Sequence, residues 1–187
     1  MQLSDLVVPY PQAIPSNVCE YFVEFFNKHS NQSSRYEGEV GPIFNQIDFT
    51  KFGLIDFETT SVNRSVAKLI NSFANLYVTS LGLKETFPKG LSNENLRIKK
   101  YSLNDKDCFP LHIDANSSEN SPRCLAMLLY LNDVEKGGET IFPNLNISFK
   151  PTKGTLLIFP PIWMFPHIGA KPISNEKYIL STYWHMS

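Results

Sequence analysis

The chain has 187 residues, of which 42% are hydrophobic and 13% aromatic, so it carries enough apolar material for the core of a folded domain. Its formal net charge is −1 and no cluster of lysine and arginine stands out, which argues against a duplex-binding protein. No apolar run is long enough to cross a bilayer, and the N-terminus lacks the basic start of a signal peptide.

The three cysteines form no CxxC motif and leave one over in any pairing. We expect free thiols, as is typical of a reducing compartment. Together these features predict one domain over residues 1–187, located in the cytoplasm, with neither a nucleic-acid nor a membrane partner. They leave the oligomeric state open.

Two stretches in the first half have apolar residues at helical spacing. The first begins after Pro15, and the second runs from Val62 to Leu81, with Ser61 or Asn63 as the expected N-cap. The connection between these helices shows no clear pattern. We expect this part of the chain, about residues 1–90, to support a catalytic core.

From about residue 95 onward, short runs rich in branched and aromatic residues alternate with turn signals. Eight such runs predict a mainly β fold, a double-stranded β-helix or jelly roll over about residues 95–187, with the N-terminal helices packed on one sheet. The expected strands are Leu96–Leu103, Phe109–Asp114, Arg123–Leu131, Glu139–Phe142, Ile147–Lys150, Thr155–Phe159, Phe165–Ile168 and Lys177–Trp184.

Three residues in these strands have the side chains of a metal site. Residues two apart in a strand share a face, so His112 and Asp114 can point at the same position. A third ligand is available in His167, from a later strand. Two histidines and one carboxylate are the ligand set of non-haem Fe(II) oxygenases, and the same three ligands also suit catalytic zinc.

A lysine in the last strand indicates which chemistry applies. Lys177 lies ten residues after His167 in an otherwise apolar segment, KYILSTYW, and a buried ammonium needs an anionic partner. The C5 carboxylate of 2-oxoglutarate would be such a partner. Ser181 has the same strand parity as Lys177 and is a candidate to add a hydroxyl to this site.

The order of several separated motifs resembles the prolyl 4-hydroxylase family of 2-oxoglutarate/Fe(II)-dependent dioxygenases. These motifs are HID, then GGETIFP (137–143), KPTKGTLLIFP (150–160) and PHIGAKPISNEKYILSTYW (166–184). The resemblance covers about half of the chain and is more specific than any single motif. It implies that His112, Asp114 and His167 bind iron and that Lys177 binds the C5 carboxylate.

The same resemblance implies roles for two tyrosines. Tyr130 matches a family tyrosine whose hydroxyl helps to hold the C5 carboxylate, and Tyr101 matches one near the substrate side. The cofactors that follow are Fe(II), 2-oxoglutarate and O₂, with ascorbate as a further candidate. The implied reaction is hydroxylation of a C–H bond, foremost that of a prolyl residue in a peptide or protein, with release of succinate and CO₂.

Other residues near the motifs have structural or functional interpretations. The polar loop at residues 115–122 is either a lid over a peptide substrate or an ordinary solvent loop. Arg123, at the end of that loop, either contacts substrate or anchors its strand. The GGET segment is interpreted as scaffold, because such glycine pairs usually serve backbone geometry.

Alternative functions remain open on the sequence. One alternative is a hydroxylase of another amino-acid side chain or of a small metabolite, since fold and metal site do not fix the substrate. Nucleic-acid demethylation is disfavoured, because the chain between Lys171 and Lys177 contains no arginine. A non-catalytic jelly-roll binding module would leave the metal motif without a purpose, and a zinc hydrolase would leave Lys177 without one.

Overall fold

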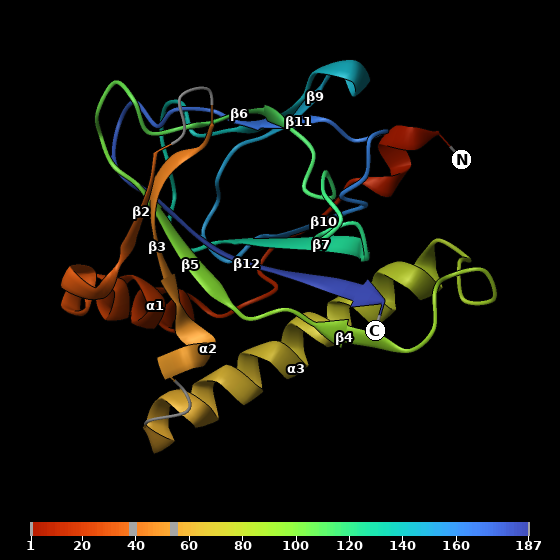
Figure 1. The fold of residues 1–187 in the computed structure, drawn as a ribbon, viewed down its shortest axis with the longest axis horizontal. Helices are drawn as coiled ribbons and strands as arrows, with labels where there is room; N and C mark the ends of the chain where they lie inside the picture. The colour runs from red at the N-terminus through yellow and green to blue at the C-terminus, as the bar shows by residue number, and fades with distance from the viewer. Residues whose placement is uncertain (1, 38–40, 53–55, 187) are drawn as a thin grey trace.

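The computed structural model describes residues 2–37, 41–52 and 56–186. Two β-sheets and a layer of helices are stacked on one another (Figure 1). The smaller sheet lies over one face of the larger sheet, and the two long helices, α1 (Ser16–Lys28) and α3 (Phe57–Ser80), lie on its other face. The predicted double-stranded β-helix with helices packed on one sheet is therefore confirmed.

The larger sheet has eight strands and runs in the order β1-β10-β7-β12-β5-β3-β2, with β4 pairing β12 off this path. Its strands are β1 (Val8–Tyr10), β2 (Ser34–Glu37), β3 (Ile43–Asp48), β4 (Leu91–Asn93), β5 (Arg97–Tyr101), β7 (Arg123–Tyr130), β10 (Leu156–Phe159) and β12 (Lys177–Met186).

The smaller sheet has four strands in the order β6-β11-β8-β9. These are β6 (Phe109–His112), β8 (Thr140–Phe142), β9 (Ile147–Phe149) and β11 (His167–Gly169). The remaining short elements are α2 (Phe49–Phe52) and three 3₁₀ turns, η1 (Leu3–Leu6), η2 (Ser30–Gln32) and η3 (Pro143–Leu145).

All eight strands expected after residue 95 are present, and their ends differ from the prediction by no more than two residues. The four strands β1 to β4 were not predicted. β1 is only three residues long and contains Pro9, β2 is exposed along its whole length, and β4 has the sequence LSN. Such segments show no alternation of polar and apolar residues, so their conformation depends on pairing with β10, β3 and β12.

The start of the long helix also differs from the prediction. α3 begins at Phe57, and its N-cap is Asp56 rather than Ser61 or Asn63. The Asp56 carboxylate accepts hydrogen bonds from the backbone N–H of Thr59 at 2.8 Å and from its hydroxyl at 2.7 Å. The prediction placed the cap at Ser61 or Asn63, beside the first apolar residue Val62, whereas the capping side chain lies five to seven residues earlier.

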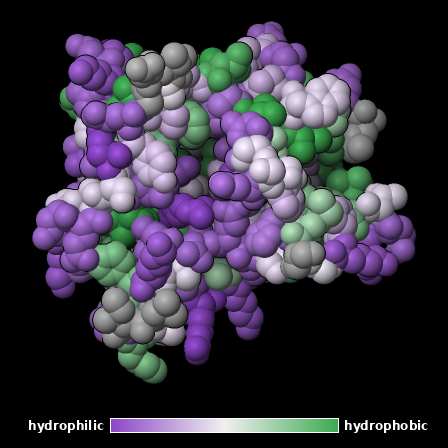
Figure 2. Space-filling view, in the orientation of Figure 1, coloured by the Kyte–Doolittle hydropathy of each residue, from purple (hydrophilic) through white to green (hydrophobic). Residues whose placement is uncertain are grey.

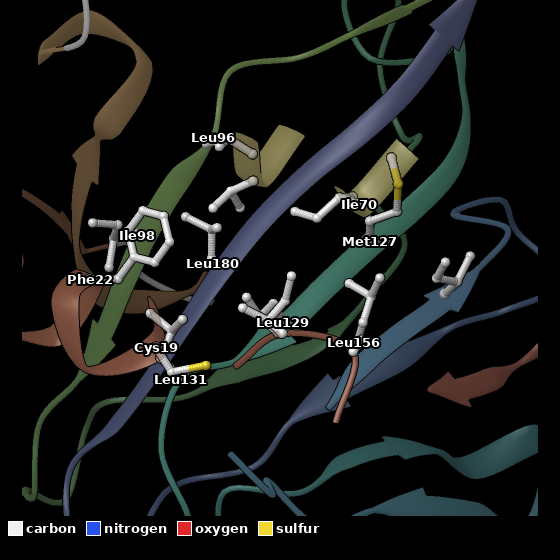
Figure 3. Packing of buried hydrophobic residues seen from close by; sticks show 14 of the residues in the cluster. Cys19, Phe22, Ile70, Leu96, Ile98, Met127, Leu129, Leu131, Leu156 and Leu180 are labelled. Atoms are coloured by element: carbon white, nitrogen blue, oxygen red, sulfur yellow. The ribbon is translucent and has the colours of Figure 1, made fainter. Parts of the chain in front are cut away.

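Two apolar cores result from the stacking. One lies between the large sheet and the helices, and the other lies between the two sheets. β12 contributes to both, because Tyr178 and Leu180 face the helices while Ile179 and Tyr183 face the small sheet. Figure 3 shows the helix-side core, and in Figure 2 hydrophilic residues cover most of the molecular face shown.

The structure also bears on the cysteines and on membrane-spanning helices. Cys19, Cys108 and Cys124 are free, as expected. Within the part of the chain that the structure describes, no helix combines the length and the apolar character needed to span a membrane.

The helix-side core gives a direct test of this packing. Phe22 is fully buried, and its ring lies 4.8 Å from that of Phe49 in an edge-on contact. Phe22→Ala is expected to lower the free energy of unfolding by about 3–5 kcal/mol, because it removes a buried aromatic ring and leaves a cavity. Urea denaturation followed by circular dichroism measures the change. The control Phe57→Ala, at a ring that is 88% exposed, should stay within about 0.5 kcal/mol of the wild type.

Candidate metal and co-substrate site

Antiparallel pairing in the small sheet brings the two predicted histidine ligands together. His112 ends β6 and lies directly opposite His167, the first residue of β11. Their ring centroids are 4.2 Å apart. Asp114 follows two residues after His112, and one ligand atom from each of the three side chains lies within 4.8 Å of the others. The three side chains that the sequence singled out therefore converge.

Both imidazoles are held in the same way. Nδ1 of His112 contacts the carbonyl oxygen of Pro110 at 2.8 Å, and Nδ1 of His167 contacts that of Phe165 at 3.1 Å. A carbonyl oxygen can only accept, so the ring hydrogen lies on Nδ1 and Nε2 keeps a free lone pair. Each Nε2 is 3.5 Å from an oxygen of Asp114, which is the orientation a metal between them requires.

The carboxylate of Asp114 is held on one side and unsatisfied on the other. Oδ1 accepts a 2.9 Å hydrogen bond from the Tyr183 hydroxyl. Oδ2 is buried and accepts no hydrogen bond from the described residues. A buried oxygen of this kind is costly unless something else binds it. With two free imidazole lone pairs beside it, the donor set fits a divalent metal ion such as Fe(II).

Burial sets the protonation states of these ligands. It lowers the pKa of the His167 imidazole to about 4, although the Asp114 carboxylate raises it, so the ring is neutral near pH 7 and able to bind metal. Burial raises the pKa of the Asp114 carboxyl, but the neighbouring imidazoles and the Lys99 ammonium bring that pKa below its ordinary value. The carboxyl is therefore ionised at neutral pH.

Arg123 anchors this region from behind. Its guanidinium lies 3.9 Å from the ring centroid of Tyr183 and donates a 2.9 Å hydrogen bond to the backbone carbonyl of Asp114. It also forms an ion pair with Glu94. These contacts fit the anchoring role considered for Arg123, and its contact with substrate stays a prediction.

Lys177 and Tyr183 line one cavity between the two sheets. Both lie on the same face of β12, Lys177 at the start of the strand and Tyr183 near its end. Six residues of strand separate the two, which corresponds to about 20 Å. The Lys177 side chain is 2% exposed and donates a 2.6 Å hydrogen bond to the carbonyl of Gly138. No carboxylate of the described residues forms an ion pair with it. Burial lowers the pKa of its ammonium to about 7.

The cavity joins the ligand end to the lysine end. Its lining residues come from both sheets and are Lys99, Tyr101, Phe109, His112, Asp114, Leu128, Thr140, His167, Gly169, Lys177, Ile179 and Tyr183. A carboxylate bound at Lys177 and a metal bound at the three ligands would therefore share one enclosed space between the sheets.

Three other predicted site residues lie at different positions in this arrangement. Tyr101 lies beside Lys177, with its ring centroid 5.2 Å from the ammonium. The ring of Tyr130 is 5.8 Å from the ammonium, and its hydroxyl donates to Thr140 at 2.8 Å. Ser181 is not brought to Lys177, because four residues of strand, about 13 Å, separate them. Its hydroxyl instead has a 3.5 Å contact with the backbone carbonyl of Arg97.

Comparison with known proteins identifies this arrangement. The 2OG-Fe(II) oxygenase superfamily matches residues 96–185. A probable prolyl 4-hydroxylase 3 of Arabidopsis thaliana is 27% identical over 95% of this chain and 68% of its own length. Prolyl 4-hydroxylase 13 of the same plant is 31% identical over 56% of this chain and 46% of its own length.

Over residues 96–185 the chain matches the 2-oxoglutarate- and iron(II)-dependent oxygenases. Its similarity is to the prolyl 4-hydroxylases, as the curated relatives indicate.

Solved structures share the fold of the oxygenase. A viral collagen prolyl hydroxylase from Paramecium Bursaria Chlorella virus-1, in complex with 2-oxoglutarate, has a TM-score of 0.71, 20% identity and 97% coverage of both chains. A prolyl-4-hydroxylase of Pseudomonas putida has a TM-score of 0.68 and 16% identity, covering 97% of this chain and 93% of its own. At these identities the likeness shows the fold alone. The epimerase SnoN from nogalamycin biosynthesis also shares it, with a TM-score of 0.67, 15% identity and coverage of 97% and 78%.

Sequence reasoning missed three residues of the oxygenase cavity. Thr140 was grouped with the GGET scaffold, yet it lines the cavity and accepts the hydrogen bond of Tyr130. Tyr183 shares the strand parity of Lys177, and Lys99 shares that of Tyr101, so alternation could have placed both of them inside. The signal was present, but tyrosine and lysine near strand ends are common on surfaces.

The Tyr183 hydroxyl gives a first test of how the metal ligands are held. Tyr183→Phe removes only the hydrogen bond to Asp114 Oδ1 and is expected to weaken Mn(II) binding roughly 10- to 100-fold, as is usual for groups that orient a ligand. Calorimetric titration of the metal-free oxygenase measures the change. The control Tyr178→Phe removes a hydroxyl that bonds Asn27 and Glu176 instead. Equal affinities for the two variants would contradict the role of Tyr183.

The Lys177 ammonium predicts a pH dependence of co-substrate binding. A bound carboxylate requires the charged ammonium, whose pKa is about 7 in the free cavity. Binding therefore takes up a proton above that pH, and the affinity for 2-oxoglutarate should fall by up to about 10-fold for each pH unit from about pH 7 to pH 9. Titration of the Mn(II)-loaded protein at several pH values measures this. Lys177→Arg, which stays charged throughout, should remove most of the dependence, whereas an unchanged slope in that variant would refute the assignment.

Proposed function

We propose that this oxygenase hydroxylates a C–H bond of a prolyl residue in a peptide or protein, while 2-oxoglutarate is converted to succinate and CO₂. The observation that carries the proposal is the single cavity with three converging ligand side chains and, at its far end, a buried ammonium without an anionic partner among the described residues. The names of the curated relatives support the choice of proline.

In this proposal His112, Asp114 and His167 hold the iron, through the two free imidazole nitrogens and the unsatisfied oxygen of Asp114. Iron(II) with 2-oxoglutarate supplies the activation of O₂ and the transfer of one oxygen atom to carbon. The backbone carbonyls that accept from each Nδ1 fix the orientation of the two rings and leave each Nε2 for the metal. Tyr183 fixes the rotation of the carboxylate, so that the ligands are positioned before the metal arrives.

Lys177 binds the C5 carboxylate of 2-oxoglutarate and thereby orients the other end of the diacid toward the metal. An ammonium buried in this way forms a strong ion pair because little water competes with the bound carboxylate. The Thr140 hydroxyl lies along the same wall, held by Tyr130, and the Tyr101 ring covers the ammonium. All four side chains are buried, so they would limit the access of water to a carboxylate bound at Lys177.

A surface groove beside the ligands supports a peptide substrate. It is lined by His112 and Asp114 themselves and by Gly41, Pro42, Phe109, Pro110, Leu111, Ile113, Asn116, Asn120 and Arg123. Among the described residues that line it, Arg123 is the only ionisable one apart from the two metal ligands, and it is already paired with Glu94. Apolar and amide groups in a groove of this kind suit an uncharged extended segment such as a proline-containing peptide.

The loop at residues 115–122 forms one wall of that groove. Oδ1 of Asn120 accepts hydrogen bonds from the backbone N–H of Asn116 at 2.7 Å and of Ser117 at 2.8 Å. The loop is thus tied to itself, and it adjoins the metal ligands through Asn116 and Asn120. In the proposal it contacts the substrate from this side. One solved neighbour, a prolyl hydroxylase of Trichoplax adhaerens, is in complex with a hypoxia inducible factor peptide fragment.

Mass spectrometry of candidate peptides tests the proposal. A proline-containing peptide should gain about 16 Da, the mass of one oxygen atom, only when both Fe(II) and 2-oxoglutarate are present. Asp114→Ala should abolish the product, because one of three ligands is lost. The control Asp133→Ala, at a residue outside the cavity, should leave the yield unchanged.

The same assay decides between substrates. Hydroxylation of free amino acids or other small metabolites, with no product on any peptide, would replace the proline proposal while leaving the oxygenase assignment intact. Purified protein that bound neither Mn(II) nor 2-oxoglutarate would favour a non-catalytic module.

A further inference from the structure

A second buried ammonium lies in the cavity, and the proposed function gives it no role. Lys99 is 8% exposed and shares one face of β5 with Tyr101. Its neighbour Lys100 points to the opposite face, where it pairs with Glu176 at 2.8 Å. Of two adjacent lysines, strand alternation places one outside with a partner and one inside the cavity.

The surroundings of Lys99 are aromatic rather than acidic. Its ammonium lies 5.1 Å from the ring centroid of Phe44 and 5.8 Å from that of Phe109. The Phe109 ring in turn stacks on the His112 ring with centroids 3.4 Å apart. Lys99 is thus one ring away from a metal ligand, whereas Lys177 lies toward Gly138. No acidic side chain of the described residues forms an ion pair with Lys99.

The ammonium of Lys99 stays charged in this place. Burial lowers its pKa to about 8, against the opposing effect of the Asp114 carboxylate, so it is mostly protonated at neutral pH. The two ring faces compensate only part of the cost of burying it. A leucine or methionine would fill the same position without that cost, so packing alone does not account for a lysine here.

The charges that the site would hold with metal and co-substrate bound also favour an anion beside Lys99. Iron(II), Lys99 and Lys177 carry the positive charges, and Asp114 and the two carboxylates of 2-oxoglutarate carry the negative ones. This leaves one positive charge without a partner among buried side chains. Enclosed charges are stable when they are paired, so the arrangement lacks one anion.

We propose that Lys99 binds a carboxylate at the metal end of the cavity, separate from the C5 carboxylate that Lys177 binds. This inference rests on the proposed function for the identity of the metal and co-substrate. The carboxylate belongs either to the primary substrate, which then carries an acidic group beyond the uncharged segment that lies in the groove, or to the keto-acid end of 2-oxoglutarate. The charge balance favours the substrate, because the metal already faces the keto-acid end.

Equilibrium titrations of the Mn(II)-loaded protein test Lys99 without any turnover. The variants are Lys99→Met and Lys99→Leu, two apolar replacements, so that failure of one to fold does not end the test. The matched control is Lys100→Met, which removes the adjacent lysine outside the cavity. The probes are 2-oxoglutarate, and then acetate and its neutral analogue acetamide, added with and without 2-oxoglutarate.

Two results support the inference and assign the carboxylate. If it belongs to 2-oxoglutarate, the Lys99 variants bind that diacid roughly 10- to 100-fold more weakly than the wild type and Lys100→Met. If it belongs to the substrate, they bind 2-oxoglutarate as the wild type does but lose its preference for acetate over acetamide. A merely structural lysine would not change that preference.

The opposite result overturns the inference. In that result, both Lys99 variants keep the wild-type affinity for 2-oxoglutarate and for acetate. A wild-type protein that does not bind 2-oxoglutarate would refute the proposed function instead, and the acetate comparison would still decide the role of Lys99.

Discussion

The register between β6 and β11 is the constraint on which the site depends. Direct pairing of His112 with His167 joins two distant parts of the chain and sets both imidazoles on the face that looks into the jelly roll. A shift by one residue would turn one of them to the opposite face. The ladder irregularity just after His167 leaves this pair in register, and Gly169 then allows the Phe109 side chain to approach closely.

The interior of the jelly roll is unusual in the charges that it holds. Two lysines and an aspartate are buried between sheets that are otherwise packed with aliphatic and aromatic side chains. Folding buries these groups at a cost, and helix-side packing against α1 and α3 makes the large sheet stable enough to carry it. Bound metal and carboxylates would relieve that cost, so we expect ligand binding and stability to be coupled in this protein.

Much of the architecture could be predicted from the sequence, and there are physical reasons why the rest could not. The eight strands after residue 95 are rich in branched and aromatic residues and are separated by turn signals, so they could be predicted from the sequence. β2 has four exposed residues and β4 three residues that depend on a partner, so neither had a pattern. In the site, the metal ligands were identifiable by residue type and spacing. Ser181 has the strand parity of Lys177 but lies four residues along β12 from it, a separation that parity does not report, so its role at the co-substrate stays a prediction.

The most direct test of the account is the position of metal and co-substrate in crystals grown anaerobically with Mn(II) and 2-oxoglutarate. The account predicts a single anomalous-scattering peak in bonding contact with His112, Asp114 and His167, and a diacid that extends from this peak to the Lys177 ammonium. A peak elsewhere, or a diacid whose far carboxylate avoids Lys177, would contradict it.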